Sequence, residues 1–160
     1  MKFYQDLGFL ILGSRLRRMS EYYLSEVNKV YQEKGIAFDA SWFPVFYILS
    51  KEEAVSLTYI ASELMVSHSA VSQLVKNLKE KELIETALSK EDKRNQTVKL
   101  SKKGEELLEQ LKPIWKAISL SLNKINKEEK GAADLLPALL SLENYFESQP
   151  LSDIILKKIK

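Results

Sequence analysis

A chain of 160 residues, 45% of them hydrophobic, is long enough for one packed domain or two fused parts, which excludes wholesale disorder. It has no cysteine and one histidine, so a disulfide framework, a thiol redox sensor and a cysteine- or histidine-rich metal site are excluded. The net charge of +2 is unevenly distributed, because nine Lys or Arg and five Asp or Glu lie between Ser67 and Gly104. Such a local excess of positive charge is typical of a surface that binds a polyanion.

The apolar run from Phe9 to Leu12 is too short for a membrane span and lacks the flanking pattern of a signal peptide. We therefore expect a cytoplasmic protein with no membrane partner.

The N-terminal segment of the chain predicts one long helix. From about Asp6 to Glu33 apolar residues recur at helical spacing, and Gly35 lies where a C-terminal cap is expected. A helix with so much apolar surface needs a partner to cover it.

The next segment is apolar nearly all round and predicts a helix at the buried centre of the fold. Asp39 or Ser41 is placed to cap this helix, which runs on to Leu49. Pro44 is tolerated because it falls in the first turn, where its missing N–H has no acceptor to lose.

Two shorter helices follow, capped by Ser56 and Ser67. The second has a continuous apolar stripe formed by Ala70, Val71, Leu74, Val75 and Leu78. Its opposite face carries His68, Ser69, Ser72, Gln73 and Lys76. A helix held to its own protein by one face, with short hydrogen-bonding side chains on the other, has the properties needed to read base edges in the DNA major groove.

A two-stranded ribbon is predicted next, from alternating residues at Ile84–Leu88 and Gln96–Leu100. Its connecting loop is entirely polar. An arginine at the tip of a ribbon can enter a narrow minor groove, and Arg94 is our candidate for this contact. Asp92 is close enough in sequence to pair with Arg94 or with neighbouring backbone and hold it in place.

The remaining chain predicts helices. Ser101 caps a long one that continues to about Ile125, with a bend expected at Pro113. Another runs from about Glu128 to Glu147. The amphipathic tail after Pro150 is expected to pack on a partner.

Three motifs together resemble the MarR family, the multiple antibiotic resistance regulators. They are the run from Ser56 to Leu78, the Asp92-Lys93-Arg94 wing, and the segment Leu100–Gly104. The resemblance implies a mainly α fold with a small β-ribbon, in which a winged helix-turn-helix is flanked by long N- and C-terminal dimerisation helices. The chain would then be one MarR-type domain over residues 1–160. Its DNA-binding lobe would lie at residues 40–101 and its dimerisation helices at residues 1–35 and 102–160.

The resemblance further implies a homodimer that binds double-stranded DNA at a pseudo-palindromic operator, commonly as a repressor released by a small, often aromatic, ligand. Carried over by position, Ser69, Ser72, Gln73 and Lys76 are the major-groove candidates and Arg94 is the wing residue. The full predicted DNA-binding set is Ser67, His68, Ser69, Ser72, Gln73, Lys76, Lys90, Asp92, Lys93, Arg94 and Asn95.

Two positions depart from the family pattern. Many relatives have arginine where this chain has Gln73, so an operator preference cannot be transferred. Glu82 replaces the usual glycine after the recognition helix. If this position is left-handed, a non-glycine residue there is strained; a cap of different geometry is the alternative.

Other residues have both a functional and a structural interpretation. A ligand pocket lined by Arg15, Trp42, Phe46 and Trp115 is one hypothesis, with core packing of the aromatic residues and a solvated or dimer-seam arginine as the alternative. His68 is either a phosphate contact at the helix start or a solvated side chain. No catalytic constellation accompanies it, and we expect neither an enzyme nor a metal or cofactor site.

A different class of function also fits the pattern, namely a helical adaptor that uses a winged-helix fold to bind a protein. It would lack salt-sensitive duplex binding.

Overall fold

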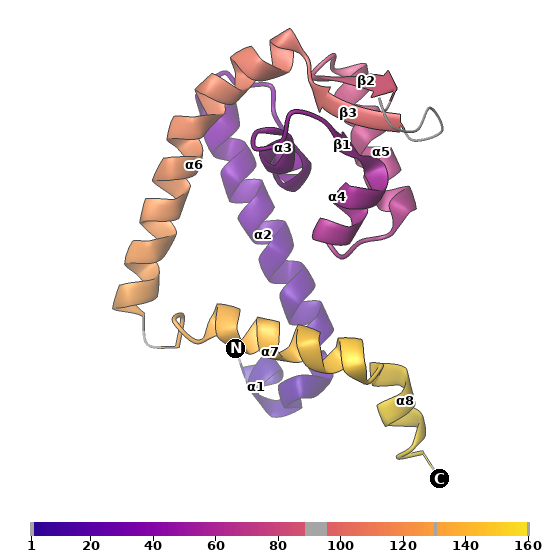
Figure 1. Ribbon diagram of the computed structural model, residues 1–160. Coiled ribbons are helices and arrows are strands. Elements are labelled where there is room, and N and C mark those ends of the chain that lie inside the picture. The colour runs from indigo at the N-terminus through magenta and orange to yellow at the C-terminus, as the bar shows by residue number, and fades with distance from the viewer. Residues whose placement is uncertain (1, 89–95, 130, 160) are drawn as a thin grey trace. The chain divides into compact units, whose positions relative to one another are not determined.

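A computed structural model describes residues 2–88, 96–129 and 131–159 (Figure 1). The chain forms two compact units, Met1–Gln110 and Leu111–Lys160. Within the described ranges no helix combines the length and the apolar character that a membrane span requires. The predicted fold class is confirmed, because helices dominate and the strands form one small antiparallel sheet.

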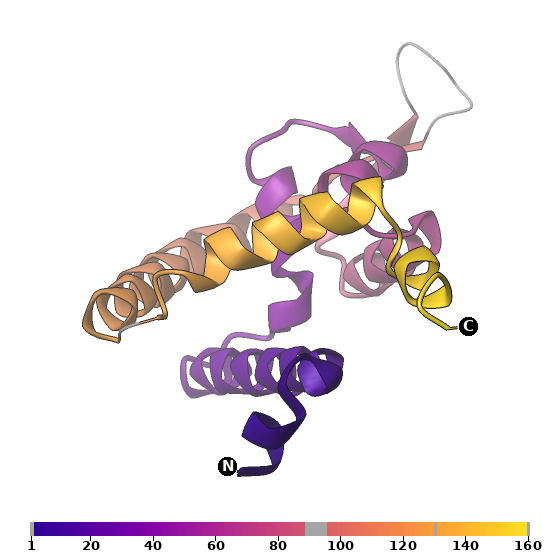
Figure 2. The same cartoon turned by 90° about the horizontal axis from the view of Figure 1, so that it is seen from below.

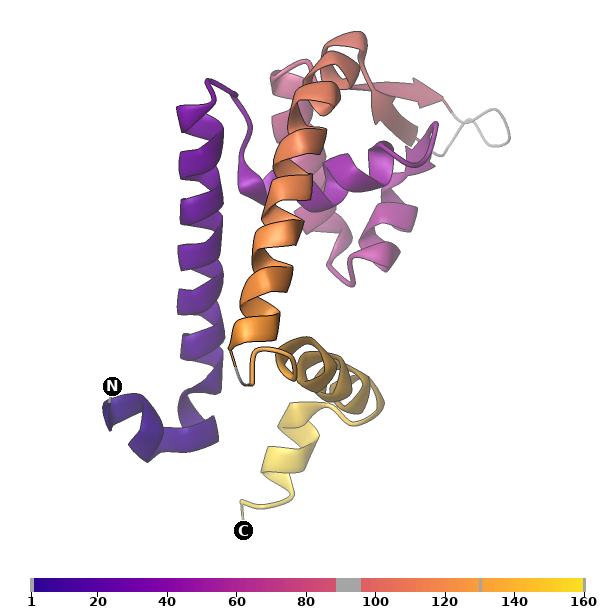
Figure 3. The same ribbon diagram turned by 90° about the vertical axis from the view of Figure 1, so that its left-hand side faces the viewer.

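The first unit begins with helices that differ in one respect from the prediction. The expected single helix is divided into α1 (Lys2–Leu7), the 3-10 turn η1 (Gly8–Ile11) and α2 (Leu12–Glu33), so its predicted start near Asp6 was wrong. Gly8 has a φ of +50°, a left-handed conformation that ends a helix. Figure 3 shows the short α1 turned away from the straight α2.

The predicted cap of α2 is confirmed. Gly35 has a φ of +66°, and its N–H donates to the carbonyl of Gln32 at 2.9 Å. The N–H of Ile36 donates to the carbonyl of Tyr31, also at 2.9 Å. These two bonds satisfy carbonyl groups at the helix end that would otherwise have no partner.

The central helix is preceded by the 3-10 turn η2 (Ala40–Trp42), which Asp39 caps by accepting a hydrogen bond from the N–H of Ser41 at 2.8 Å. Helix α3 (Phe43–Leu49) follows, with its proline in the first turn as predicted. The buried residues of α3 are Val45, Phe46 and Leu49. Phe43 and Tyr47 are partly exposed, so α3 is only in part the buried centre that its composition predicted.

The lobe that follows contains β1 (Val55–Ser56), α4 (Leu57–Glu63), α5 (His68–Glu80), β2 (Ile84–Leu88) and β3 (Gln96–Leu100). The sheet order is β1-β3-β2, with both pairs antiparallel. Both predicted strands have the predicted bounds, and Ile84 pairs with Leu100. The two-residue strand β1 was not predicted.

The core of the first unit is assembled around Phe38, which lies between α2 and α3. Its ring makes edge-on contacts with Tyr31 at 5.3 Å, Trp42 at 5.6 Å and Phe46 at 5.2 Å between centroids. Pairs in this geometry contribute on the order of 1 kcal/mol beyond the area that they bury. This cluster joins α2 to the segment that begins the lobe.

Helix α6 (Lys102–Glu128) begins in the first unit and continues into the second, which also contains α7 (Leu135–Ser148) and α8 (Leu151–Leu156). Helix α7 starts seven residues later than predicted, after a turn in which Gly131 has a φ of +92°. Figure 2 shows α8 turned away from the end of α7. Many large apolar side chains of α7 and α8 are exposed, including Leu136, Leu140, Tyr145, Ile155 and Leu156.

Candidate nucleic-acid interface

Helix α5 is fixed to the lobe by its apolar stripe. Val71, Val75 and Leu78 are buried, whereas Leu74 is half-buried and Ala70 exposed. Burying three such side chains stabilises the attachment by roughly 1.5–3 kcal/mol each. The predicted stripe is therefore confirmed at Val71, Val75 and Leu78, and it leaves the opposite side of α5 facing away from the core.

The start of α5 is set by its cap. The Ser67 hydroxyl accepts a hydrogen bond from the N–H of Ala70 at 3.3 Å and lies 2.9 Å from the Ser69 hydroxyl. Ser56 caps α4 in the same way, accepting from the N–H of Tyr59 at 3.0 Å. Both predicted caps are confirmed, and they fix where each of the two helices of the helix-turn-helix begins.

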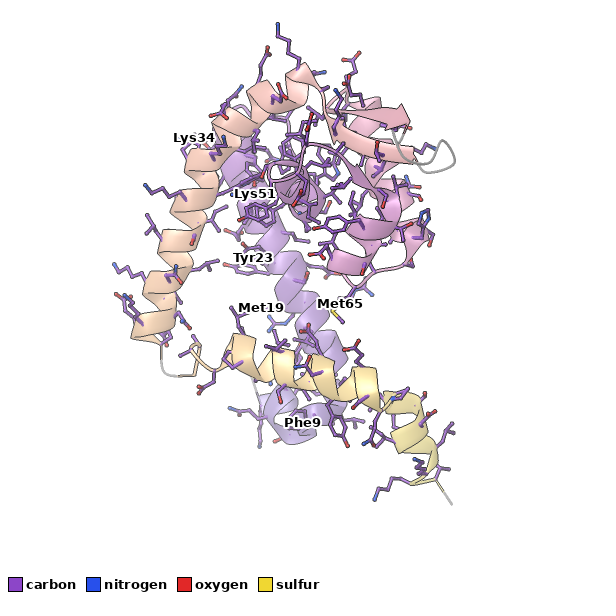
Figure 4. All side chains as sticks on the ribbon, viewed as in Figure 1. Phe9, Met19, Tyr23, Lys34, Lys51 and Met65 are labelled. Carbon is purple, nitrogen blue, oxygen red and sulfur yellow. The ribbon has the colours of Figure 1, made fainter. Side chains whose placement is uncertain are left out.

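The turn between α4 and α5 contains a feature that the sequence did not predict. Met65 is left-handed, with a φ of +53°, and its side chain is 69% exposed. Figure 4 labels it at the edge of the lobe. A residue other than glycine in this conformation is uncommon and strained, and the tight turn that it makes brings Ser67 into position to cap α5.

The polar face of α5 is exposed and internally hydrogen-bonded. Gln73 Nε2 donates to Asn77 Oδ1 at 3.0 Å, and Ser72 Oγ donates to the carbonyl of His68 at 2.9 Å. Lys76 Nζ lies 3.9 Å from Glu80 Oε1. His68, Ser69, Gln73 and Lys76 are all exposed, and Ser72 is half-buried. Of the predicted set, α5 thus brings these five residues and its cap onto one helix face.

Asn77 was not among the predicted residues. It is half-buried one turn after Gln73, and it holds the amide of Gln73 through the hydrogen bond described above. Residues four apart on a helix are neighbours, and this spacing is the signal that identifies Asn77 in the sequence.

The end of α5 is locked to the start of α6. Ser101 Oγ donates to the carbonyl of Glu82 at 2.6 Å and accepts from the N–H of Gly104 at 3.0 Å. The predicted cap of α6 is thus confirmed. Gly104 is buried against the carbonyl of Leu83, and an added Cβ would lie only 2.0 Å from that oxygen.

Glu82 is left-handed, with a φ of +61°, which is the first of the two alternatives considered for this position. Its carboxylate accepts a hydrogen bond from Lys103 Nζ at 2.9 Å. This hydrogen bond and the nearby positive charge lower the pKa of Glu82 from its ordinary value. Glu82, at the position where the family pattern has glycine, thus has Lys103 of α6 as its ion-pair partner.

The base of the wing is formed by the paired strands β2 and β3. Glu85 and Lys99 are directly opposite each other on β2 and β3, and their charged groups lie 2.8 Å apart. That hydrogen bond and ion pair raise the pKa of Lys99. The predicted wing residues Lys90, Asp92, Lys93, Arg94 and Asn95 lie outside the described residues.

Of the predicted ligand-pocket residues, Trp42 and Phe46 both contact the ring of Phe38, whereas Arg15 lies elsewhere on the first unit. Phe46 is fully buried against Phe38, and Arg15 lies over the ring of Tyr4, 5.8 Å from its centroid. A hollow of about 260 Å³ in the first unit is lined by other residues, among them Lys81, Leu83, Lys103 and Leu107. A site formed by Arg15, Trp42, Phe46 and Trp115 stays a prediction.

Comparison with known proteins gives one family. Residues 38–95, which include the helix-turn-helix and the first strand of the wing, match the model of the MarR family. No curated protein matches. Among solved structures, a MarR/EmrR family transcriptional regulator from Acinetobacter sp. ADP1 is 25% identical, with a TM-score of 0.66, over 86% of this chain and 96% of that one.

Two further solved structures share the fold. MepR from S. aureus, in complex with DNA, is 20% identical with a TM-score of 0.68, over 82% of this chain and 97% of that chain. Bordetella bronchiseptica BpsR, whose DNA binding is regulated by 6-hydroxynicotinic acid, is 20% identical with a TM-score of 0.64, over 82% of this chain and 91% of that chain.

Proposed function

We propose, from the premise that this chain is a MarR-family transcription regulator, that it acts as a homodimer that binds a pseudo-palindromic operator and represses transcription until a small ligand releases it. The observation that carries the proposal is the arrangement of α5. Its apolar stripe is buried, and its hydroxyl, amide and ammonium groups are left on an exposed face. Such a face supplies hydrogen bonds to base edges and phosphates without unfolding the lobe.

Exposed apolar side chains on α2 support the homodimer. Met19 is 57% exposed and Tyr22 61% exposed, and Leu16, Tyr23 and Val30 are also exposed. Figure 4 labels Met19 and Tyr23 on this helix. A long helix with so much uncovered apolar surface is characteristic of an interface, and two-fold pairing of identical chains is the commonest way to cover it.

In a two-fold dimer, the two copies of α5 would enter successive major grooves on the same face of the DNA. Half-sites read in this way are separated by about 34–36 Å, or 10–10.5 base pairs. The predicted wing would add contacts in the flanking minor groove, where its positive charge is favoured.

Relief by a ligand is proposed from the family resemblance and from the regulation of BpsR by 6-hydroxynicotinic acid. Aromatic carboxylates are therefore the first compounds to test as effectors of duplex binding. Release from the operator on addition of such a compound would support this part of the proposal. An unchanged affinity across a panel of such compounds would contradict release by a ligand of this class. It would not affect the proposal that the protein binds DNA.

The direct test of DNA binding measures affinity for a selected duplex at several salt concentrations. We expect log K to fall linearly with log salt, with a slope of about −0.9 for each phosphate neutralised. An adaptor that binds proteins would show neither the affinity nor the slope.

Replacing Arg94 with alanine is expected to weaken duplex binding by about tenfold and to reduce the salt slope by about 2, since each protomer would lose one contact with DNA charge. Fluorescence anisotropy with a labelled duplex measures both quantities. Lys51→Ala is the matched control, because Lys51 is an exposed cation just after α3, outside both α2 and the predicted DNA-binding residues. Unchanged affinity and slope for Arg94→Ala would show that the wing assignment is wrong.

A further inference from the structure

Helix α2 is tied to the start of the lobe by a polar clamp formed by Asn28, Asp39 and Ala40. Asn28 is half-buried on α2, and its Oδ1 accepts a hydrogen bond from the N–H of Ala40 at 2.7 Å. Asn28 Nδ2 donates to Asp39 Oδ2 at 3.5 Å. One amide side chain thus holds both the backbone and the side chain of the segment that begins the lobe.

The clamp is joined to the cap of the lobe's first turn. The other carboxylate oxygen of Asp39, Oδ1, accepts from the N–H of Ser41 at 2.8 Å and from Ser41 Oγ at 2.6 Å. Asp39 Oδ1 therefore caps the turn that precedes α3, and Asp39 Oδ2 accepts from Asn28 on α2. A rotation of the lobe on α2 would break the contacts with Asn28 while leaving the cap intact.

The aromatic contacts of Phe38 join the same two parts of the molecule, but they act differently. Ring contacts are short-range and tolerate small rotations, since the rings can slide against each other. Hydrogen bonds weaken steeply as their angles depart from linear. The ring contacts of Phe38 and the hydrogen bonds of Asn28 thus both join α2 to the start of the lobe, and the hydrogen bonds are the more sensitive of the two to a rotation.

We propose that Asn28 is a positioning residue that sets the orientation of the DNA-binding lobe on α2, and thereby the half-site spacing that the dimer accepts. This inference rests on the proposed function, because spacing has meaning only for a dimer that reads two half-sites. One inserted base pair displaces a half-site by about 3.4 Å and rotates it by about 34°. A fixed lobe discriminates against such a change, and a lobe free to rotate accommodates it.

The test compares a selected symmetric duplex with versions that carry one base pair more or fewer at the centre. We expect wild type to bind the altered duplexes about thirtyfold more weakly, and Asn28→Ala to bind them only about threefold more weakly than the unaltered one. Glu52→Gln is the control, because Glu52 is exposed just after α3, outside the predicted DNA-binding residues and the predicted dimerisation helices. It should keep the wild-type discrimination.

A swapped pair separates positioning from a general loss of structure. Asn28→Asp keeps the acceptor for the N–H of Ala40 but removes the donor and faces the Asp39 carboxylate with a like charge, so spacing discrimination should fall. Adding Asp39→Asn to that variant restores one donor and one acceptor with the roles exchanged, and asparagine is an equally good cap. We expect the double variant to recover at least about half of the discrimination, on a logarithmic scale, with both variants folded by circular dichroism.

The outcomes are distinguishable. If wild type binds no symmetric duplex, the proposed function fails. If wild type discriminates between spacings and both Asn28→Ala and Asn28→Asp do so equally, the positioning role of Asn28 is wrong. If Asn28→Ala does not fold, the comparison of Asn28→Asp with the swapped pair decides, and a double variant that recovers nothing overturns the inference.

Discussion

Replacing Gly104 with alanine is expected to destabilise the protein by about 3 kcal/mol, at the upper end of what overpacking a core position costs. The added Cβ would lie 2.0 Å from the carbonyl oxygen of Leu83, and that oxygen is backbone, which cannot rotate away. The same carbonyl accepts a hydrogen bond from the N–H of Ser101 at 3.1 Å. Relief of the clash would therefore separate the end of α5 from the start of α6.

Urea unfolding monitored by circular dichroism measures this effect. Gly13→Ala is the matched control, because Gly13 lies inside α2 and an added Cβ would meet nothing within 4 Å. Alanine there, in the first turn of α2, should leave stability unchanged to within about 0.5 kcal/mol. A Gly104→Ala protein as stable as wild type would show that α5 and α6 do not approach as closely as described.

The second large effect is expected at Gln73. Its alanine variant should bind a selected duplex about thirtyfold more weakly, because a dimer would lose one bidentate base contact in each half-site at about 1 kcal/mol apiece, the lower end of the usual range. We take the lower end because Gln73 Nε2 must first leave Asn77 Oδ1, to which it donates at 3.0 Å. Binding to unrelated duplexes and the salt slope should stay unchanged, since a neutral amide neutralises no phosphate.

Competition binding with selected and unrelated duplexes checks this expectation. Gln32→Ala, at an exposed position near the end of α2, is the control. Equal losses on both kinds of duplex would contradict base recognition by Gln73 and assign its effect to folding or to general affinity.

The helix-turn-helix and the ribbon could be predicted because their signals are local. Ser56, Ser67 and Ser101 each precede a run with helical periodicity, and all three cap the helices that they were predicted to cap. The bounds of β2 and β3 follow from their alternation, which has a period of two residues and ends at a polar loop. At Glu82 the family pattern left two geometries open, and the backbone is left-handed there.

Features that depend on backbone conformation or on distant contacts could not be predicted. The break at Gly8 interrupts a helical pattern that continues on both sides, so periodicity alone misses it. Strand β1 has two residues and exists because Val55 pairs with Val98, far along the chain. The Asn28 clamp likewise joins residues that no local pattern connects.

The claim that the exposed polar face of α5 reads DNA is tested most directly by selecting bound duplexes from a random pool with the full-length protein. The account predicts enrichment of a two-fold symmetric motif with half-site centres separated by about 10–10.5 base pairs. The affinity of the protein for duplexes that carry this motif should fall steeply as the salt concentration rises. A pool that emerges without an enriched motif, with wild-type protein shown to be folded, would contradict the account.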